Sequence, residues 1–428
     1  MKKFNIINTN LIIILWSTLI FCLTFLIDNS YFYYFFPVFQ IFIGVICIYV
    51  AYKKEGNLVS IYNAYYLIWL IIIPITSYPY PLMNLMNATS WRYCLIGNCC
   101  FSISLILSRF IKVEKLNNKF FNSFIRLNIF EFLIYIFIII FSIFYLLFDS
   151  YLRGGFAIFF DNVKESSVLP LYDLISSLGS FSIFMLLQNK NLRKKWIIVS
   201  LSLVYMLLSI LTGIRWTIIL LVIMLVSTLK INFKSMKYLL IIFIGVIFVF
   251  MFANYFRRGD EEIINNYINS GLYDGSISAF FYTEIFRYFG MCQRLIVEYV
   301  NSNIPHTNGL YTYYSFMKWF TSLELPGNIW INGYNALNII GYLYLDFGQL
   351  WPIILIGWSF VLFISYRIYK NNSNNYLVKY IYSTCFMMIT LSFYCYMQHY
   401  VYSLTIYPLM LIFLHMLGTI FKEKIKED

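Results

Sequence analysis

Charged side chains are scarce in this chain of 428 residues, and several familiar enzyme motifs are absent. Lys, Arg, Asp and Glu together make up only 12% of the sequence. There is no P-loop, no GxGxxG or GxSxG segment, no HExxH pair and no DxD-like metal pair in a plausible setting. The eight cysteines form no CxxC pair, so neither a zinc site nor a disulfide framework is indicated. We expect no cofactor, no metal ion and no use of ATP.

Apolar residues dominate the sequence and recur in long runs. They make up 61% of the chain, and aromatic residues alone make up 21%. A soluble fold of this size lacks the polar groups needed to cover such a surface, so the sequence predicts an all-α polytopic membrane protein. About twelve transmembrane helices are predicted, over residues 8–27, 31–52, 58–75, 91–111, 128–148, 171–188, 196–212, 214–230, 237–256, 349–369, 377–396 and 401–420.

The distribution of positive charge sets the predicted orientation. The opening segment MKKFNIINTN leads into an apolar run without a small-residue cleavage site, so we expect no cleavable signal peptide. With the N-terminus inside, 22 of the 31 Lys and Arg residues fall in short inward loops and tails. The net charge of +12 is then mostly a consequence of topology, and nucleic-acid binding is not expected. We predict a protein of the cytoplasmic membrane with both termini in the cytoplasm.

The remaining cations lie at the predicted outer face, and seven of these nine are arginines. They are Arg92, Arg153, Lys164, Arg215, Arg257, Arg258, Arg287, Arg294 and Lys318. Orientation requires only positive charge, whereas arginine presents a planar fork that matches phosphate and carboxylate oxygens. The bias indicates an anionic ligand outside, with ion pairs inside the loops as the structural alternative. Arg215 also requires compensation because apolar residues flank it on both sides.

One predicted external loop, residues 257–335, is far longer than the others. A loop of that length is usually functional or disordered, and its aromatic content argues against disorder. Residues 278–300 within it are predicted to form a helix with one narrow charged stripe, made of Glu284, Arg287, Arg294 and Glu298. The stripe either lines a cavity or neutralises itself through pairs three and four residues apart.

Three further positions in or beside this loop carry candidate chemistry. The pair Arg257–Arg258 lies where a span exits the membrane, and it suits a lipid phosphate or local pairing with the acids at 260–262. His306 is the only histidine of the loop and is either a general base near neutral pH or an ordinary loop residue. Asp346 opens an Asp-Phe-Gly segment where the chain re-enters the membrane, and we expect it to cap the next helix.

Ionisable residues are nearly absent from the middle of the predicted spans. Glu131 and Asp173 lie near span starts and are interpreted as helix-start acids, while His415 in the last span is interpreted as a packed neutral residue. A proton- or sodium-coupled transporter normally buries such groups in mid-membrane. The concentration of polar residues outside therefore favours an enzyme at the outer leaflet over a pump.

Taken together, three segments resemble the O-antigen or oligosaccharide repeat-unit polymerases (Wzy-type), relatives of the O-antigen ligases. The segment TGIRW (212–216) is similar to the short arginine hairpin at the outer end of a mid-chain span in that family. The large external loop and the segment YLYLDFGQLWPIILIG (342–357) follow in the family's order. Ile214 and Trp216 depart from the pattern, because small residues are commoner beside the family's arginine.

The resemblance implies a GT-C-like glycosyltransferase of the bacterial cytoplasmic (inner) membrane, with its active site facing the periplasm or exterior. It would join undecaprenyl-pyrophosphate-linked oligosaccharides into O-antigen or capsular polysaccharide, with undecaprenyl pyrophosphate as leaving group and no cofactor. A flippase and a chain-length regulator are the implied partners in the same membrane.

On that hypothesis, arginines stabilise the charge on the departing pyrophosphate. Arg215 is the first candidate, Arg287 and Arg294 are its partners, and Arg257 and Arg258 hold the second lipid's phosphate. His306 is the first candidate for the base that activates the acceptor hydroxyl, with Glu284 or Asp346 behind it. Tyr313, Tyr314 and Trp319 either stack on sugars or anchor the loop at the interface. The alternatives are an O-antigen ligase, a lipid-linked oligosaccharide flippase and a membrane acyltransferase.

Overall fold

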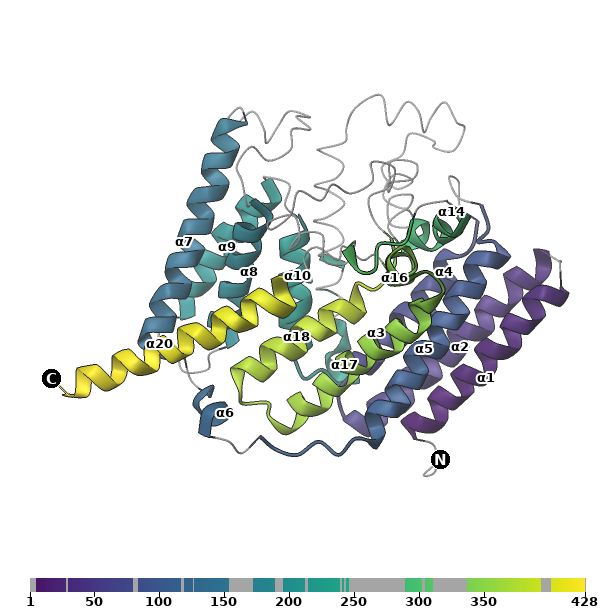
Figure 1. Cartoon of the computed structure of the whole chain (residues 1–428), viewed down its shortest axis with the longest axis horizontal. Coiled ribbons are helices and arrows are strands. Elements are labelled where there is room, and N and C mark those ends of the chain that lie inside the picture. Colours follow the sequence, from purple (N-terminus) through teal and green to yellow (C-terminus); the bar gives the residue numbers. More distant parts are fainter. Residues whose placement is uncertain are drawn as a thin grey trace.

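The computed structural model shows an all-helical protein. It describes residues 5–27, 30–79, 84–116, 119–125, 127–153, 172–188, 195–211, 215–238, 241, 244–245, 289–301, 305–310, 337–393 and 402–427. Every regular element in these ranges is a helix, and no extended β-strand occurs among them (Figure 1).

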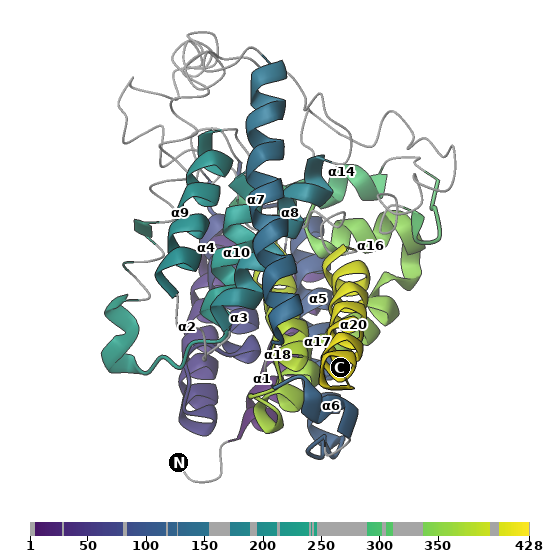
Figure 2. The same ribbon diagram turned by 90° about the vertical axis from the view of Figure 1, so that its left-hand side faces the viewer.

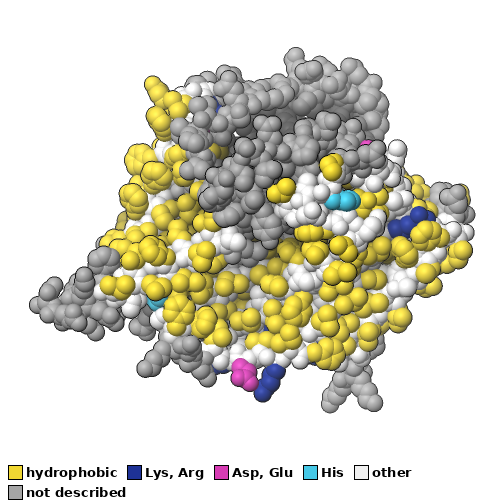
Figure 3. All heavy atoms as spheres, in the orientation of Figure 1, with side chains coloured by type: hydrophobic (Ala, Val, Ile, Leu, Met, Phe, Trp, Pro, Cys, Tyr) yellow, Lys and Arg dark blue, Asp and Glu magenta, His cyan; other side chains and the backbone are white. Residues whose placement is uncertain are grey.

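Five of the described helical stretches are long and apolar enough to cross a membrane. They comprise α1 (Ile6–Leu26), α2 (Ser30–Glu55), α5 (Ala88–Phe110), α7 (Ile129–Leu152), and α16 (Ile339–Phe347) joined through a bend to α17 (Trp351–Asn371). Their outward faces carry large exposed apolar side chains, including Phe137 and Phe144 of α7 at 66% exposure each. Figure 3 shows apolar side chains spread over this face of the molecule. Such a surface is compatible with a membrane-embedded protein and costly in water.

Shorter apolar helices complete the bundle. They are α3 (Ile61–Leu67), which continues through the π-turn η1 (Ile68–Ile72) into α4 (Ile73–Thr76), then α8 (Tyr172–Gln188), α9 (Lys195–Leu211), α10 (Arg215–Ser227), α18 (Tyr376–Thr390) and α20 (Tyr407–Glu427), the last entered through the π-turn η6 (Tyr402–Ile406). Helices occupy eleven of the twelve predicted span ranges. Most of the twelfth, 237–256, lies outside the described residues.

Asparagine and serine side chains start many of these helices. Asn5, Ser60, Asn87, Asn128, Asn338 and Asn375 each accept a backbone N–H in the first turn of the helix that follows. These caps satisfy donors that have no partner within the helix itself. At α7 the cap is reciprocal, because Glu131 also accepts the backbone N–H of Asn128. Glu131 is therefore the helix-start acid that the sequence predicted, whereas the side chain of Asp173 lies outside the described residues.

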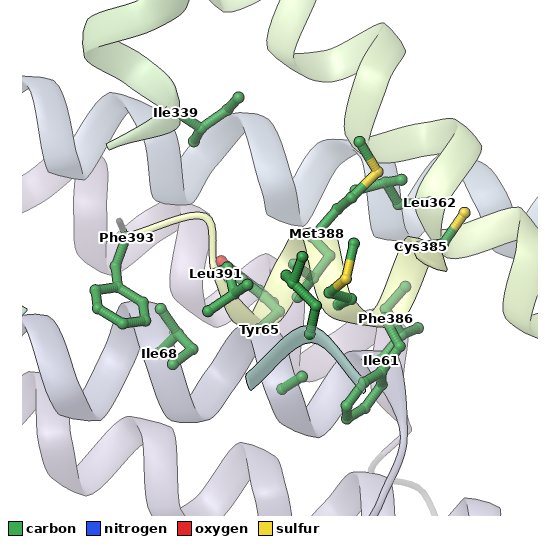
Figure 4. Packing of buried hydrophobic residues seen from close by; sticks show 14 of the residues in the cluster. Ile61, Tyr65, Ile68, Ile339, Leu362, Cys385, Phe386, Met388, Leu391 and Phe393 are labelled. Carbon is green, nitrogen blue, oxygen red and sulfur yellow. The ribbon is translucent and has the colours of Figure 1, made fainter. Parts of the chain in front are cut away.

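Two groups of helices pack on either side of α18. Helices α1, α2, α3 and α5 pack with α17 in one group, and α7, α8, α9 and α10 pack in the other (Figures 1 and 2). Helix α18 contacts α3 and α17 of the first group and α10, α8 and α20 on the other side. Figure 4 shows Phe386 and Met388 of α18 among apolar side chains that include Ile61 and Leu362. The buried core thus runs continuously through both groups.

A buried acid ties three helix ends together. The carboxylate of Glu55 at the end of α2 lies 2.7 Å from Nη2 of Arg109 on α5 and 2.8 Å from Nζ of Lys370 on α17. The sequence predicts all three of these ends to face the cytoplasm, so their contact agrees with that topology. We call this the inner end of the bundle, and the opposite end the outer end.

Candidate functional site

A sharp bend separates α16 from α17 where the chain returns from the long loop. Asn338 caps the start of α16, and the helix ends at Phe347. Gly348 then adopts a left-handed backbone with φ of 53°, which glycine tolerates far better than other residues. A short 3₁₀ turn, Gly348–Leu350, leads into α17, which has a proline in its first turn. The Asp-Phe-Gly segment therefore forms the bend between α16 and α17, and we call residues 345–350 the corner.

Residues 305–310 of the long loop lie against this corner. The backbone N–H of Asn308 donates to the carbonyl of Asp346 at 2.8 Å, and the Thr307 hydroxyl donates to Asp346 Oδ1 at 2.6 Å. Asn308 and Gly309 both have positive φ, 53° and 101°, so the segment turns tightly at this point. The loop and the corner are thus joined through the backbone carbonyl and the side chain of Asp346.

His306 is held at the surface of the same corner. Its Nδ1 lies 3.2 Å from the carbonyl oxygen of Leu345, and its ring packs edge-on against Tyr344. A carbonyl only accepts, so Nδ1 carries the hydrogen in this contact, and the tautomer of the neutral imidazole that fits it has its lone pair on Nε2. The side chain is exposed. The arrangement fixes the orientation of an exposed imidazole ring.

Gly348 makes room for that nitrogen. A Cβ atom placed on Gly348 would lie 2.7 Å from His306 Nε2 and 2.8 Å from its Cδ2, closer than such contacts occur. The glycine therefore serves both the backbone conformation of the corner and the approach of the imidazole. This pairing was not predicted from the sequence, because 42 positions separate the two residues and only the fold joins them.

Asp346 differs from its predicted role. The residue before α17 is Leu350, and no side chain caps that helix. The Asp346 carboxyl is instead fully buried in the last turn of α16 and accepts the hydroxyl of Thr307. Its prediction as the cap of the following helix was wrong. A buried carboxylate with this contact holds the loop in place, and its position does not favour the reserve role of base.

Arg294 is hydrogen-bonded to backbone carbonyls of the protein. Its five N–H groups donate to five backbone carbonyls, those of Thr76, Ser77, Tyr78, Asn84 and Gly290, at 2.8–3.1 Å. A guanidinium has five donors, so none remains for a phosphate oxygen in this arrangement. Burial lowers the pKa of this side chain to about 10, which leaves it charged at neutral pH. Arg294 thus joins the helical residues 289–294 of the loop to the outer end of α4 by hydrogen bonds. In this arrangement it neither faces a ligand nor pairs with Glu298.

Two further outer arginines also have partners within the chain. Arg92 donates to the hydroxyl and carbonyl of Thr24 and lies over the ring of Phe25 at 3.7 Å. Arg153 pairs with Asp149 at 2.5 Å one turn earlier in α7 and donates to Tyr172. Arg153 thus shows the ion pair that was the structural alternative, whereas Arg92 is held by hydrogen bonds to another helix.

Arg215 is the first residue of α10, and its position along that helix places it at the outer end. The segment just after the other end of α10 meets the inner end of the bundle, because Asn57 accepts the N–H of Ile231 at 2.8 Å and donates to the carbonyl of Leu229. The thirteen residues of α10 span about 20 Å at 1.5 Å per residue. The side chain of Arg215 lies outside the described residues.

The other predicted site residues are not described by the structure. The segment 246–288, which lies outside the described residues, contains Glu284, Arg257, Arg258 and Arg287. The segment 311–336 is also outside them, and it contains Tyr313, Tyr314 and Trp319. Of the charged stripe, the structure describes only Arg294 and an exposed Glu298. His306 and Asp346 are therefore the predicted site residues that the described structure brings into one place.

The described site is the bend between α16 and α17, where exposed His306 lies on a loop segment that the buried carboxyl of Asp346 holds in place. A neutral imidazole can accept a proton from a hydroxyl group near neutral pH. No protein-family model matches the chain, and no curated protein or solved structure shows significant similarity to it.

Proposed function

We propose that this protein is a GT-C-like glycosyltransferase with about twelve transmembrane helices. It polymerises undecaprenyl-pyrophosphate-linked oligosaccharide repeat units at the outer face of a bacterial cytoplasmic membrane. The apolar helices support a membrane location. The order of the arginine hairpin, the long loop and the Asp-Phe-Gly segment supports the reaction class, through the resemblance described above.

The observation that carries the proposal is the geometry of His306. Its Nδ1 is hydrogen-bonded to the carbonyl of Leu345, and Nε2 of this exposed side chain lies beside Gly348 at the outer end of the bundle. The Asp-Phe-Gly corner on which the resemblance depends is thus the place where the structure presents a basic nitrogen. This proximity of His306 to the Asp-Phe-Gly segment supports the proposal.

In the proposed reaction, Nε2 of His306 accepts the proton of the acceptor sugar hydroxyl. The hydroxyl oxygen forms a bond to the anomeric carbon of the growing chain, and the bond from that carbon to undecaprenyl pyrophosphate breaks. The leaving group departs with the bonding electron pair, and its new negative charge requires fixed cations. Arg215 is the proposed first cation, assisted by Arg287, while Arg257 and Arg258 hold the phosphates of the second lipid.

The structure changes the proposed set in two ways. Arg294 is assigned to positioning of the loop, because its donors are used by carbonyls. Asp346 is assigned to positioning of residues 305–310 and leaves His306 as the base, with Glu284 as the remaining alternative.

The test compares surface polysaccharide in a deletion strain that carries wild type, His306→Gln, Arg215→Ala or Arg215→Lys. We expect His306→Gln and Arg215→Ala to reduce the ladder to a single repeat unit, and Arg215→Lys to restore it only in part, since lysine lacks the bidentate fork. Lys112→Ala, at an exposed inner position, is the control that keeps the full ladder. A full ladder from His306→Gln would remove the histidine from the mechanism.

The same gels separate the alternative functions. Single units that still reach the outer surface mean that polymerisation is the missing step. If no lipid-linked unit reaches the outer leaflet, the protein moves the substrate, as a flippase would. Full-length polymer that is not attached to lipid A-core would indicate a ligase. A chain-length regulator and a flippase are the proposed membrane partners.

A further inference from the structure

The chain crosses the inner end of the bundle between α5 and α7 as a strap, residues 111–125. The structure describes residues 111–116 and 119–125 of it, including the short helix α6 (Lys119–Ser123). Figure 1 shows the strap along the lower edge of the view, running from the end of α5 towards the start of α7. Nothing in the proposed reaction uses this segment.

The asparagine-rich turn between α17 and α18 fixes one side of the strap. Nδ2 of Asn371 donates to the carbonyl of Val113 at 2.9 Å. Oδ1 of Asn372 accepts the backbone N–H of Leu116, also at 2.9 Å. Because these bonds are made by the backbone of the strap, they set which of its sides faces the bundle.

The other side of the strap carries exposed apolar side chains. Phe124 faces the bundle and is fully buried, in contact with the ring of Tyr376. Ile111, Phe120 and Ile125 are instead 41%, 40% and 53% exposed. Exposure of several large apolar side chains on one short segment is unfavourable in water and indicates an apolar surrounding.

The strap connects the apolar faces of two long helices. Phe110, the last residue of α5, is 72% exposed, and Ile129, the first residue of α7, is 80% exposed. Both helices are long and apolar enough to cross a membrane. A segment that joins the ends of two such helices lies where the headgroup region of a bilayer begins. The exposed side chains of the strap are therefore continuous with surfaces that suit lipid.

The strap also carries net positive charge. Its sequence contains Lys112, Lys115 and Lys119 and one acid, Glu114. Lys112 lies 3.3 Å from Glu114, so these two charges largely cancel, whereas Lys115 is exposed. Exposed apolar residues interleaved with lysine are typical of segments that lie in a membrane surface and bind anionic lipids.

We infer that the strap is a binding surface for anionic phospholipid in the leaflet at the inner end of the bundle. Its outward apolar side chains enter the boundary between headgroups and acyl chains, and Lys115 and Lys119 supply the charge that attracts lipid phosphates. An acidic protein would meet the same lysines, but the continuity with the faces of α5 and α7 favours lipid. The inference rests on the membrane location of the helices and not on the proposed glycosyl transfer.

The test measures amide hydrogen exchange of residues 111–125 in the whole protein, reconstituted in nanodiscs of phosphatidylcholine alone or with phosphatidylglycerol added. We expect phosphatidylglycerol to slow exchange in the strap of the wild type. The effect should fade at high salt, because ions screen the attraction between exposed charges. Strap exchange that is the same in both lipids, or a difference that ignores salt, overturns the inference.

A matched pair of variants separates the strap from the general charge of the inner end. Lys115→Gln/Lys119→Gln should lose most of the lipid effect, since each lysine near an anionic surface contributes about fivefold to binding. Lys53→Gln/Lys54→Gln removes the same charge from exposed positions at the end of α2 and should keep the effect. Equal loss in the two variants would mean attraction to the whole inner end and would remove the strap as the binding surface.

Ile125→Ser tests the apolar part of the surface. We expect it to speed exchange in the strap in nanodiscs that contain phosphatidylglycerol, because serine gains nothing from insertion below the headgroups. Ile125→Leu keeps the apolar side chain and should match the wild type. Strap exchange in Ile125→Ser equal to that of Ile125→Leu would contradict insertion of the strap.

Discussion

The Nε2 atom of His306 lies 2.7 Å from the point that a Cβ atom on Gly348 would occupy. The imidazole of the long loop therefore packs directly on Gly348, in the corner between α16 and α17. This contact makes the glycine a direct test of whether the position of the imidazole matters.

Gly348→Ala should abolish most activity by displacing the imidazole and straining a backbone with φ of 53°. The strain alone is about 1–3 kcal/mol, because φ of 53° with ψ of −132° is a conformation that almost only glycine adopts, and we expect the protein still to fold. The polysaccharide ladder and a thermal melt measured together distinguish loss of activity from loss of protein. Gly357→Ala on α17 is the matched control, since a Cβ there meets nothing within 4 Å. Equal ladders from the two variants would show that the histidine position is unimportant.

Thr307→Val should weaken the loop attachment, because it removes the hydroxyl that donates to the buried Asp346 carboxyl. Leaving a buried acceptor without this donor costs about 1–3 kcal/mol. We expect faster proteolysis of the loop at 305–310 and a shorter ladder. Thr307→Ser retains the hydroxyl and should behave as wild type. Unchanged proteolysis of the valine variant would mean that the backbone contact of Asn308 suffices.

Arg294→Lys should destabilise the protein without a specific effect on catalysis. Lysine has three donors where the guanidinium uses five, so at least two outer carbonyls lose a partner, at about 2–4 kcal/mol. Thermal melts in detergent report the loss, and activity should fall only in proportion to the folded protein. Glu298→Gln, exposed on the next helix, α14 (Ile296–Asn301), serves as the control. An active-site role would reappear if Arg294→Lys folded normally yet made no polymer.

Glu55→Gln should loosen the inner end of the bundle. It removes the buried carboxylate that meets Arg109 and Lys370 while preserving its shape. Breaking a fully buried pair costs about 3–5 kcal/mol, and the partial exposure of Arg109 and Lys370 reduces our expectation to about 2 kcal/mol. Glu114→Gln, from an exposed pair with Lys112, should change stability by less than about 1 kcal/mol. Similar melts for both variants would contradict this account of the inner end.

The long apolar runs predicted the helices well because a membrane span needs such a run, whatever it packs against. The positive charges likewise predicted that the ends of α2, α5 and α17 share a side, and Glu55 joins those ends. Glu131 was recognisable because a capping box is local in sequence. Each of these signals depends on neighbours along the chain.

Partners across the fold were not predictable in the same way. Arg294 is satisfied by carbonyls, which every residue has, so no sequence pattern marks the turn after α4 as its acceptor. The contact of His415 with Glu131 was not predicted, because 284 positions separate the two residues and only the fold brings them together. Asp346 was assigned to the wrong helix for the same reason, since its true partner is a threonine of the loop.

The burial of α18 also bears on how this protein tolerates change. Thirteen of its fifteen residues are buried, from Tyr376 to Ile389. Almost any substitution along it therefore leaves a void or a clash between the two groups of helices. The outward face of α7, by contrast, exposes Phe137 and Phe144, which pack against little of the protein and can be replaced by other apolar residues. A library of single substitutions should thus be depleted along α18 and permissive along α7, and that contrast would map the interior of the molecule without any structure.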